Sequence, residues 1–156
     1  MAELKARLQA DLAAAIKARE TTRMAALRMA LAAVTTEEVA GDVARELSDD
    51  EVQKVLTREV KKRKEAAEAF EGAGRTERAE AERAESEVLT GYLPRQLSDD
   101  ELETLVAEAF AEVTEQLGAA PGQRQMGQVM KAANAKIAGR AEGGRVAASV
   151  RAKLQS

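Results

Sequence analysis

The chain has no histidine and no cysteine among its 156 residues. Composition therefore excludes the Ser-His-Asp and Cys-His arrangements of hydrolases, and zinc sites built on imidazole or thiolate ligands. No disulfide can form, and a cysteine-free chain suits a reducing compartment, so we expect a cytoplasmic protein. The sequence also lacks a P-loop, a dinucleotide fingerprint and a nucleophile elbow. We therefore predict no catalytic residue, no cofactor and no enzyme activity of the chain on its own.

Aromatic side chains and long apolar runs are also scarce. Aromatic residues make up 2% of the chain and tryptophan is absent, so the core must consist of Leu, Val, Ala, Met and Ile. Without aromatic platforms, stacking on single-stranded bases is disfavoured, and a nucleic acid would be recognised by its shape and backbone. No run approaches the ~20 apolar residues of a membrane span, and the N-terminus lacks the apolar region of a signal peptide. We expect neither membrane insertion nor export.

Apolar residues recur at helical spacing along nearly the whole chain. The first two stripes are Leu4, Leu8, Leu12 and Ile16, followed by Met24, Leu27, Leu31 and Val34. No segment alternates polar and apolar residues for long enough to predict a strand. The fold class is therefore all-α. We predict an N-terminal domain of about four helices over residues 1–95 and a three-helix bundle over 96–156, divided after Tyr92-Leu93-Pro94, because proline disfavours helical geometry in the residue before it.

The pentapeptide Leu-Ser-Asp-Asp-Glu occurs twice, and each copy has the pattern of a helix start. Ser48 and Ser98 are predicted N-caps, and Glu51 and Glu101 stand at the third helical position, where they complete a capping box. A metal site is the functional alternative, but the spacing is not that of a calcium-binding loop. The sequences diverge beyond the pentapeptide, which favours convergent capping over an internal repeat.

Charge is unevenly distributed along the chain. Residues 120–156 carry seven basic side chains and one acidic one, a net charge of +6, whereas residues 1–119 have a net charge of −9. The basic residues of this tail are Arg124, Lys131, Lys136, Arg140, Arg145, Arg151 and Lys153. A cationic segment on an acidic protein indicates an anionic partner, of which nucleic acid is the commonest. Gly139, Gly143 and Gly144 lie at a predicted helix start, where exposed amides and flanking arginines can hold phosphate. The simpler alternative is that these basic residues are surface side chains of a small helical bundle and bind no ligand.

A second basic run lies on the long third predicted helix. It comprises Arg58, Lys61, Lys62, Arg63 and Lys64. Such a run is usually a solvated helix face, and nearby glutamates partly neutralise this one. We therefore treat it as a secondary basic patch.

Several short segments, taken together, resemble a known family. They are Leu27-Arg28-Met29, Leu56-Thr57-Arg58-Glu59-Val60-Lys61-Lys62-Arg63, Ala73-Gly74-Arg75, Tyr92-Leu93-Pro94-Arg95-Gln96-Leu97, Met126-Gly127-Gln128-Val129-Met130-Lys131 and Gly139-Arg140-Ala141. In this order and spacing they resemble the GatB/YqeY family over essentially the whole chain. The most specific part is Tyr-Leu-Pro followed by a capped helix and Met-Gly-x-Val-Met-Lys.

The resemblance implies a helical N-terminal domain, a three-helix C-terminal domain and a relation to tRNA. The B subunit of glutamyl/aspartyl-tRNA amidotransferase, a carbon–nitrogen ligase with glutamine as amido-N-donor, has a related tail that helps hold tRNA. By this resemblance, tRNA contact maps onto Gly127, Lys131, Lys136, Arg140 and Arg145. The chain corresponds to the tail alone, so we expect at most an accessory role in amidation.

We interpret the chain as a non-catalytic, tRNA-associated helical adaptor. The expected partners are tRNA or tRNA-handling enzymes, with no membrane and no metal, and the sequence leaves the oligomeric state open. The alternative is a protein–protein interaction module that docks on an acidic partner surface.

Overall fold

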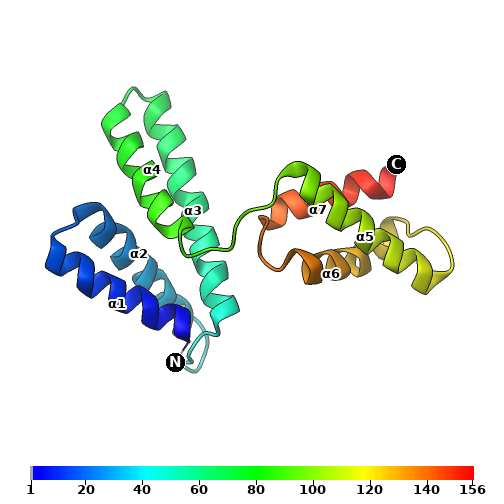
Figure 1. The fold of residues 1–156 in the computed structure, drawn as a ribbon, viewed down its shortest axis with the longest axis horizontal. Coiled ribbons are helices and arrows are strands. Elements are labelled where there is room, and N and C mark those ends of the chain that lie inside the picture. Colours follow the sequence, from blue (N-terminus) through cyan, green and yellow to red (C-terminus); the bar gives the residue numbers. More distant parts are fainter. Residues whose placement is uncertain (1) are drawn as a thin grey trace. The chain divides into compact units, whose positions relative to one another are not determined.

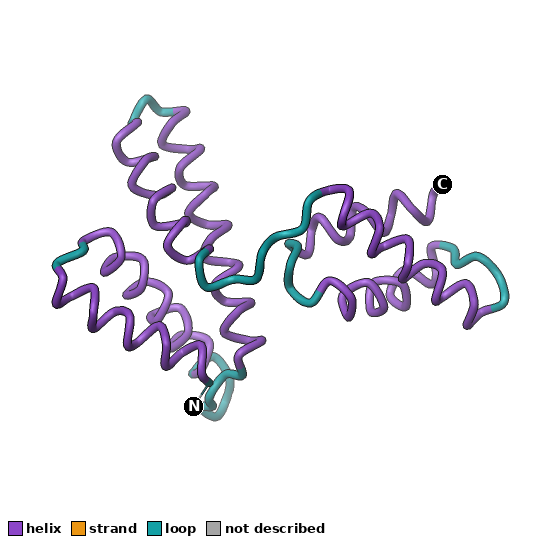
Figure 2. The backbone as a smooth tube through the Cα atoms, in the orientation of Figure 1, coloured by secondary structure: helices purple, strands orange, loops and turns teal. Residues whose placement is uncertain are grey.

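The computed structural model describes residues 2–156, and all regular secondary structure in this range is helical. The helices are α1 (Glu3–Ala18), α2 (Thr21–Glu38), α3 (Asp49–Gly72), α4 (Thr76–Thr90), α5 (Asp99–Leu117), α6 (Met126–Ile137) and α7 (Gly143–Gln155), with a single 3-10 turn at Gln123–Gln125 before α6 (Figures 1 and 2). The chain packs as two compact units, one ending at Leu93 and the other beginning at Pro94. The all-α class, with four helices followed by three, is confirmed.

The N-terminal unit (α1–α4) is held together by aliphatic side chains. Helices α1 and α2 lie side by side, and α3 and α4 form a long hairpin (Figure 1). The largest fully buried side chains are Leu8, Leu27, Val34, Val52, Val55, Leu56 and Leu89. Leu8, Leu27 and Val34 come from the two apolar stripes predicted from the sequence, although Ile16 of the first stripe is exposed. Leu89 lies on α4, for which no stripe was predicted.

The C-terminal unit (α5–α7) is a small three-helix bundle. Its core combines Leu102, Val106 and Val113 of α5 with Val129 and Ile137 of α6 and Val146 and Val150 of α7. The bundle is small, so buried polar contacts between its helices and loops weigh heavily in its stability. Within residues 2–156, no helix is both long and apolar enough to cross a membrane.

Both predicted N-caps are confirmed. The Ser48 hydroxyl accepts a hydrogen bond from the Glu51 amide at 3.2 Å, and the Ser98 hydroxyl accepts one from the Glu101 amide at the same distance. At the start of α3 the capping box is complete, because the Ser48 amide donates to the Glu51 carboxylate at 2.9 Å. Leu47, which precedes the first cap, is buried, as a hydrophobic staple requires.

An arginine three residues before each cap serine extends the repeated motif. Arg45 contacts the Glu51 carboxylate at 2.9 Å, and Arg95 contacts that of Glu101 at 2.7 Å. Both copies therefore read Arg-x-Leu-Ser-Asp-Asp-Glu. The two ion pairs were not predicted from the sequence, although the equal distance of each arginine from its cap serine is a signal that indicates them. The second copy fixes where α5 begins in the C-terminal unit, and this unit carries the candidate site.

Candidate nucleic-acid interface

Charge in the C-terminal unit is segregated by helix. Residues 94–156 carry eight basic and eight acidic side chains, so this unit is neutral overall. Helix α5 holds seven of the acids and no base, whereas α6 and α7 hold only bases. The positive charge of the tail is therefore balanced by the acids of α5 in the same bundle. Which basic side chains remain available to an anionic partner depends on the contacts that each one makes.

Lys136 faces the acidic helix. Its amino group lies 2.9 Å from the Glu112 carboxylate and 3.9 Å from that of Glu108, both on α5. The hydrogen bond to Glu112 is the main cause of the raised pKa of Lys136. Lys136 therefore links α6 to α5, and α5 already balances its charge.

Arg140 closes the C-terminal end of α6. Its Nε donates to the Ile137 carbonyl and its Nη2 to the Lys136 carbonyl, both at 2.9 Å. These carbonyls belong to the last turn of the helix, where i→i−4 backbone partners end; the Ile137 carbonyl also accepts the Arg140 amide at 3.1 Å. The left-handed Gly139, with φ of 78°, turns the chain so that Arg140 can fold back. The backbone carbonyl of Arg140 also accepts the Leu97 amide at 2.7 Å, which ties this loop to the entry of α5.

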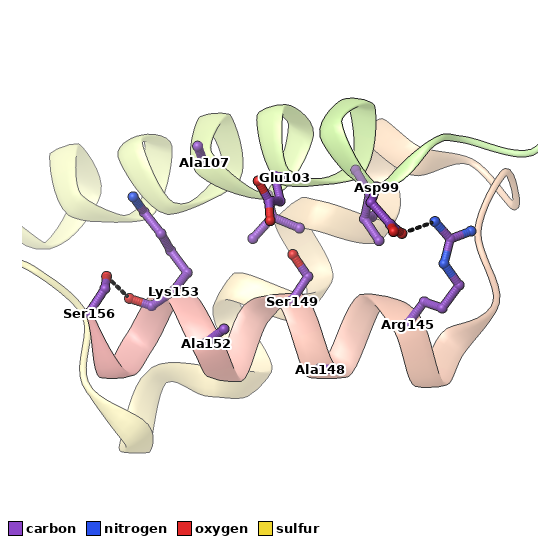
Figure 3. A pocket seen from close by; sticks show the side chains of 11 residues that line it. Asp99, Glu103, Ala107, Arg145, Ala148, Ser149, Ala152, Lys153 and Ser156 are labelled. Atoms are coloured by element: carbon purple, nitrogen blue, oxygen red, sulfur yellow. Dashed lines mark hydrogen bonds and ion pairs between the residues drawn. The ribbon is translucent and has the colours of Figure 1, made fainter.

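Arg145, in the first turn of α7, also binds the chain at the start of α5. Its Nη2 donates to the Leu97 carbonyl at 3.0 Å. The same nitrogen donates to the Asp99 carboxylate at 3.0 Å (Figure 3). The amide of Leu97 is therefore held by the loop that joins α6 to α7, and its carbonyl by the first turn of α7. Arg140 and Arg145 have structural roles that explain their residue types without a ligand.

A groove of about 680 Å³ runs between α5 and α7. Arg145, Ser149 and Lys153 point from α7 toward α5, and Asp99 and Glu103 lie on the α5 side (Figure 3). The Lys153 amino group lies 5.4 Å from the centre of the Phe110 ring. Because carboxylates line one side, the groove does not suit a polyanion.

The outer face of α6 has a different character. We define it as the exposed residues Arg124, Gly127, Gln128, Lys131 and Asn134, of which the first lies in the 3-10 turn. Helix α6 contains no acidic residue, and Arg124 and Lys131 have no ion pair within the described structure. They stand seven residues apart, or about 10 Å along a helix axis. Arg124 was not among the sequence-predicted contacts, although the helical period from Gly127 and Lys131 indicates it.

Gly127 lies in this face without a packing reason. Its backbone is helical, and a Cβ added there would meet no atom within 4 Å. Glycine weakens a helix relative to alanine, so the fold itself gains nothing from it. A bare backbone at this position is suited to close approach by a ligand.

The secondary basic patch is divided by the structure. Arg63 is buried, with 6% of its surface exposed, and the other four residues are exposed on α3. Arg58 pairs with Glu37 at 3.2 Å, and Lys62 pairs with Glu59 at 3.5 Å. The patch is therefore not one continuous cationic surface. Across residues 2–156, no group of three or more acidic side chains is arranged to hold a metal ion.

Comparison with known proteins agrees with the resemblance found in the sequence. A family model described as Yqey-like protein matches residues 5–154, which is nearly the whole chain. A search of curated proteins finds none that matches.

Proposed function

The chain belongs to the YqeY-like family, and we propose that it is a non-catalytic, cytoplasmic adaptor whose C-terminal unit binds tRNA through the outer face of α6. The relation to the amidotransferase tail, implied by the resemblance, makes tRNA the first RNA to consider. On this proposal the chain is at most accessory to a glutamine-dependent tRNA amidotransferase and performs no amidation itself.

One observation carries the proposal: the cations of the outer face of α6 are free of acidic partners. Lys136 and Arg145 are engaged by carboxylates of α5, and Arg140 by backbone carbonyls, whereas Arg124 and Lys131 have no such contact within the described structure. Gly127 lies between them without a Cβ. Two cations flanking a bare stretch of helix fit the phosphates of a nucleic-acid backbone.

The absence of acidic residues on α6 also indicates which side of the bundle a polyanion would approach. The carboxylates of the C-terminal unit are concentrated on α5, with one more at Glu142. A polyanion would therefore be repelled from the α5 side and attracted to the α6 side. The exposed amide side chain of Asn134 can donate hydrogen bonds to phosphate or ribose oxygens, whereas that of Gln128 already donates one to Gln116 of α5 at 3.3 Å.

The test is a titration of unfractionated tRNA against the full chain at several salt concentrations. Neutralising two or three phosphates predicts a slope of about −2 to −3 in a plot of log affinity against log salt. Lys131→Glu combined with Arg124→Glu should weaken binding at low salt. Lys17→Glu combined with Arg28→Glu is the matched control, because both residues are exposed, on α1 and α2, and the total charge change equals that of the double variant. The proposal would be contradicted if the affinity for tRNA did not depend on the salt concentration, or if the double variant had the same affinity as the wild-type chain. A partner captured from lysate that remains after nuclease treatment, without tRNA, would favour the protein-docking alternative.

A further inference from the structure

The outer part of the α3–α4 hairpin, within the described structure, lacks large buried apolar side chains. Beyond Val60 on α3 and before Val88 on α4, the buried residues of the described structure are Arg63, Ala67, Ala79 and Ser86. We call residues 61–87 the arm. Ala67 and Ala79 each bury little apolar area, so the arm gains much less from burial than the aliphatic core below it.

A charged cluster lies at the base of this arm. The Arg63 guanidinium lies 3.7 Å from the Glu59 carboxylate, 3.8 Å from that of Glu82 and 3.6 Å from that of Glu85. Glu59 and Arg63 come from α3, and the other two glutamates from α4. Lys62, which is largely exposed, also lies 3.5 Å from Glu59.

Arg63 and Glu59 are buried, Glu82 and Glu85 are partly buried, and the hydrogen-bonding groups of the cluster are incompletely satisfied. Side-chain exposure is 8% for Arg63, 9% for Glu59, 24% for Glu82 and 17% for Glu85. The Nε of Arg63 and one carboxylate oxygen of Glu82 are buried without a hydrogen-bond partner. On helix α2, the thioether of Met29 lies 3.1 Å from Nη2 of Arg63. Three carboxylates thus share one buried guanidinium, and excess buried charge of one sign is costly.

From this geometry we propose that the Arg63 cluster is a proton-sensitive latch that holds α4 onto α3 and controls the opening of the arm. One added proton removes a buried negative charge and leaves Arg63 with two carboxylates. At neutral pH the latch is strained by repulsion between Glu82 and Glu85, and the arm opens more often. At mildly acidic pH it closes. The device is independent of RNA binding by α6.

Glu85 is the carboxyl group that this repulsion affects, and the direction of its pKa shift sets the direction of the pH dependence. Burial raises the pKa of Glu85, the charge of Glu82 raises it further, and Arg63 lowers it. An acid whose pKa is raised on folding adds stability below its unfolded pKa, and that stability is lost as the pH rises through the folded value. The arm should therefore be most stable below the ordinary glutamate range and weaken toward neutrality.

Hydrogen exchange of the full chain, corrected for intrinsic rates, tests the latch. Between about pH 7 and about pH 4.5, protection in the arm should rise several-fold while protection in α5–α7 does not follow. Glu85→Gln should give high protection at neutral pH and abolish the pH dependence of the arm. Glu80→Gln, on the exposed face of α4, is the control and should retain it. Arg63→Met should loosen the arm at neutral pH. The proposal is overturned if Glu85→Gln keeps the wild-type pH dependence, or if the arm is less protected at the lower pH.

Discussion

Arg145, in the first turn of α7, donates a hydrogen bond at 3.0 Å to the backbone carbonyl of Leu97, which lies 48 residues earlier. Leu97 precedes the N-cap of α5, and its amide donates to the Arg140 carbonyl. The start of the first helix of the bundle is therefore held by the loop between the second and third helices and by the first turn of the third. Residues that looked like anion ligands in the sequence stabilise the bundle that carries the candidate interface.

Arg145→Ala should destabilise the C-terminal unit by about 1–2 kcal/mol, because it removes a charge-assisted hydrogen bond to a half-buried carbonyl. Hydrogen exchange of α5 measures the loss. Arg151→Ala removes the same charge from an exposed position on the same helix and should leave α5 protection unchanged. Equal effects of the two variants would show that Arg145 acts through charge alone.

Gly127→Ala separates stability from binding. Nothing lies within 4 Å of the added Cβ, so stability should stay constant or rise by a few tenths of a kcal/mol. Affinity for tRNA should fall if the backbone of α6 approaches phosphate or ribose closely. Gly122→Ala, just before the 3-10 turn, offers a comparison at an exposed glycine outside α6. Unchanged affinity of the Gly127 variant would place the RNA contact elsewhere.

Glu101 makes the start of α5 sensitive to acid. Its hydrogen bonds from Arg95, and then from Ser98, lower its pKa to about 2. A carboxyl group whose pKa is lowered on folding contributes stability above its unfolded pKa, and loses it as the pH falls through the folded value. Protection of α5 should therefore decrease between about pH 4.5 and about pH 2. In Glu101→Gln, the protection of α5 should change little over this pH range. Glu103→Gln, at an exposed neighbour without a described partner, should retain the decrease in protection.

Tyr92 is the single tyrosine of a chain without tryptophan, so its ionisation can be followed directly by ultraviolet absorbance. Burial, and then the hydrogen bond that its hydroxyl donates to Asp11, raise its pKa to about 12. Stability that depends on the neutral phenol is present below the ordinary pKa of about 10 and is lost as the pH rises toward 12. Asp11→Asn should lower the midpoint, but not to the ordinary value, because burial is the larger cause.

Asp42→Asn is the control for that titration, since Asp42 is exposed in the loop after α2 and should leave the midpoint of Tyr92 unchanged. A wild-type midpoint near the ordinary value for tyrosine would contradict the described contact with Asp11.

Much of the fold could be predicted from the sequence because its causes are local. The N-caps Ser48 and Ser98 depend on amides three residues away, and the apolar stripes depend on a period of 3.6 residues. The candidate site was predictable only in part. Lys131 and Gly127 lie on the exposed surface expected of a contact, whereas Lys136, Arg140 and Arg145 have partners within the bundle.

The sequence by itself determined the helical class, the helix starts and the surplus of positive charge in the tail, because these follow from neighbouring residues and composition. Only the tertiary structure decided which of those charges are free. The acids that neutralise Lys136 and Arg145 lie on α5, and they are brought into range by packing of the bundle. The same holds for Arg63, which reads as part of an exposed basic run but is buried against two glutamates of α4. The strength of an ion pair depends on distance and burial, and both are properties of the folded chain.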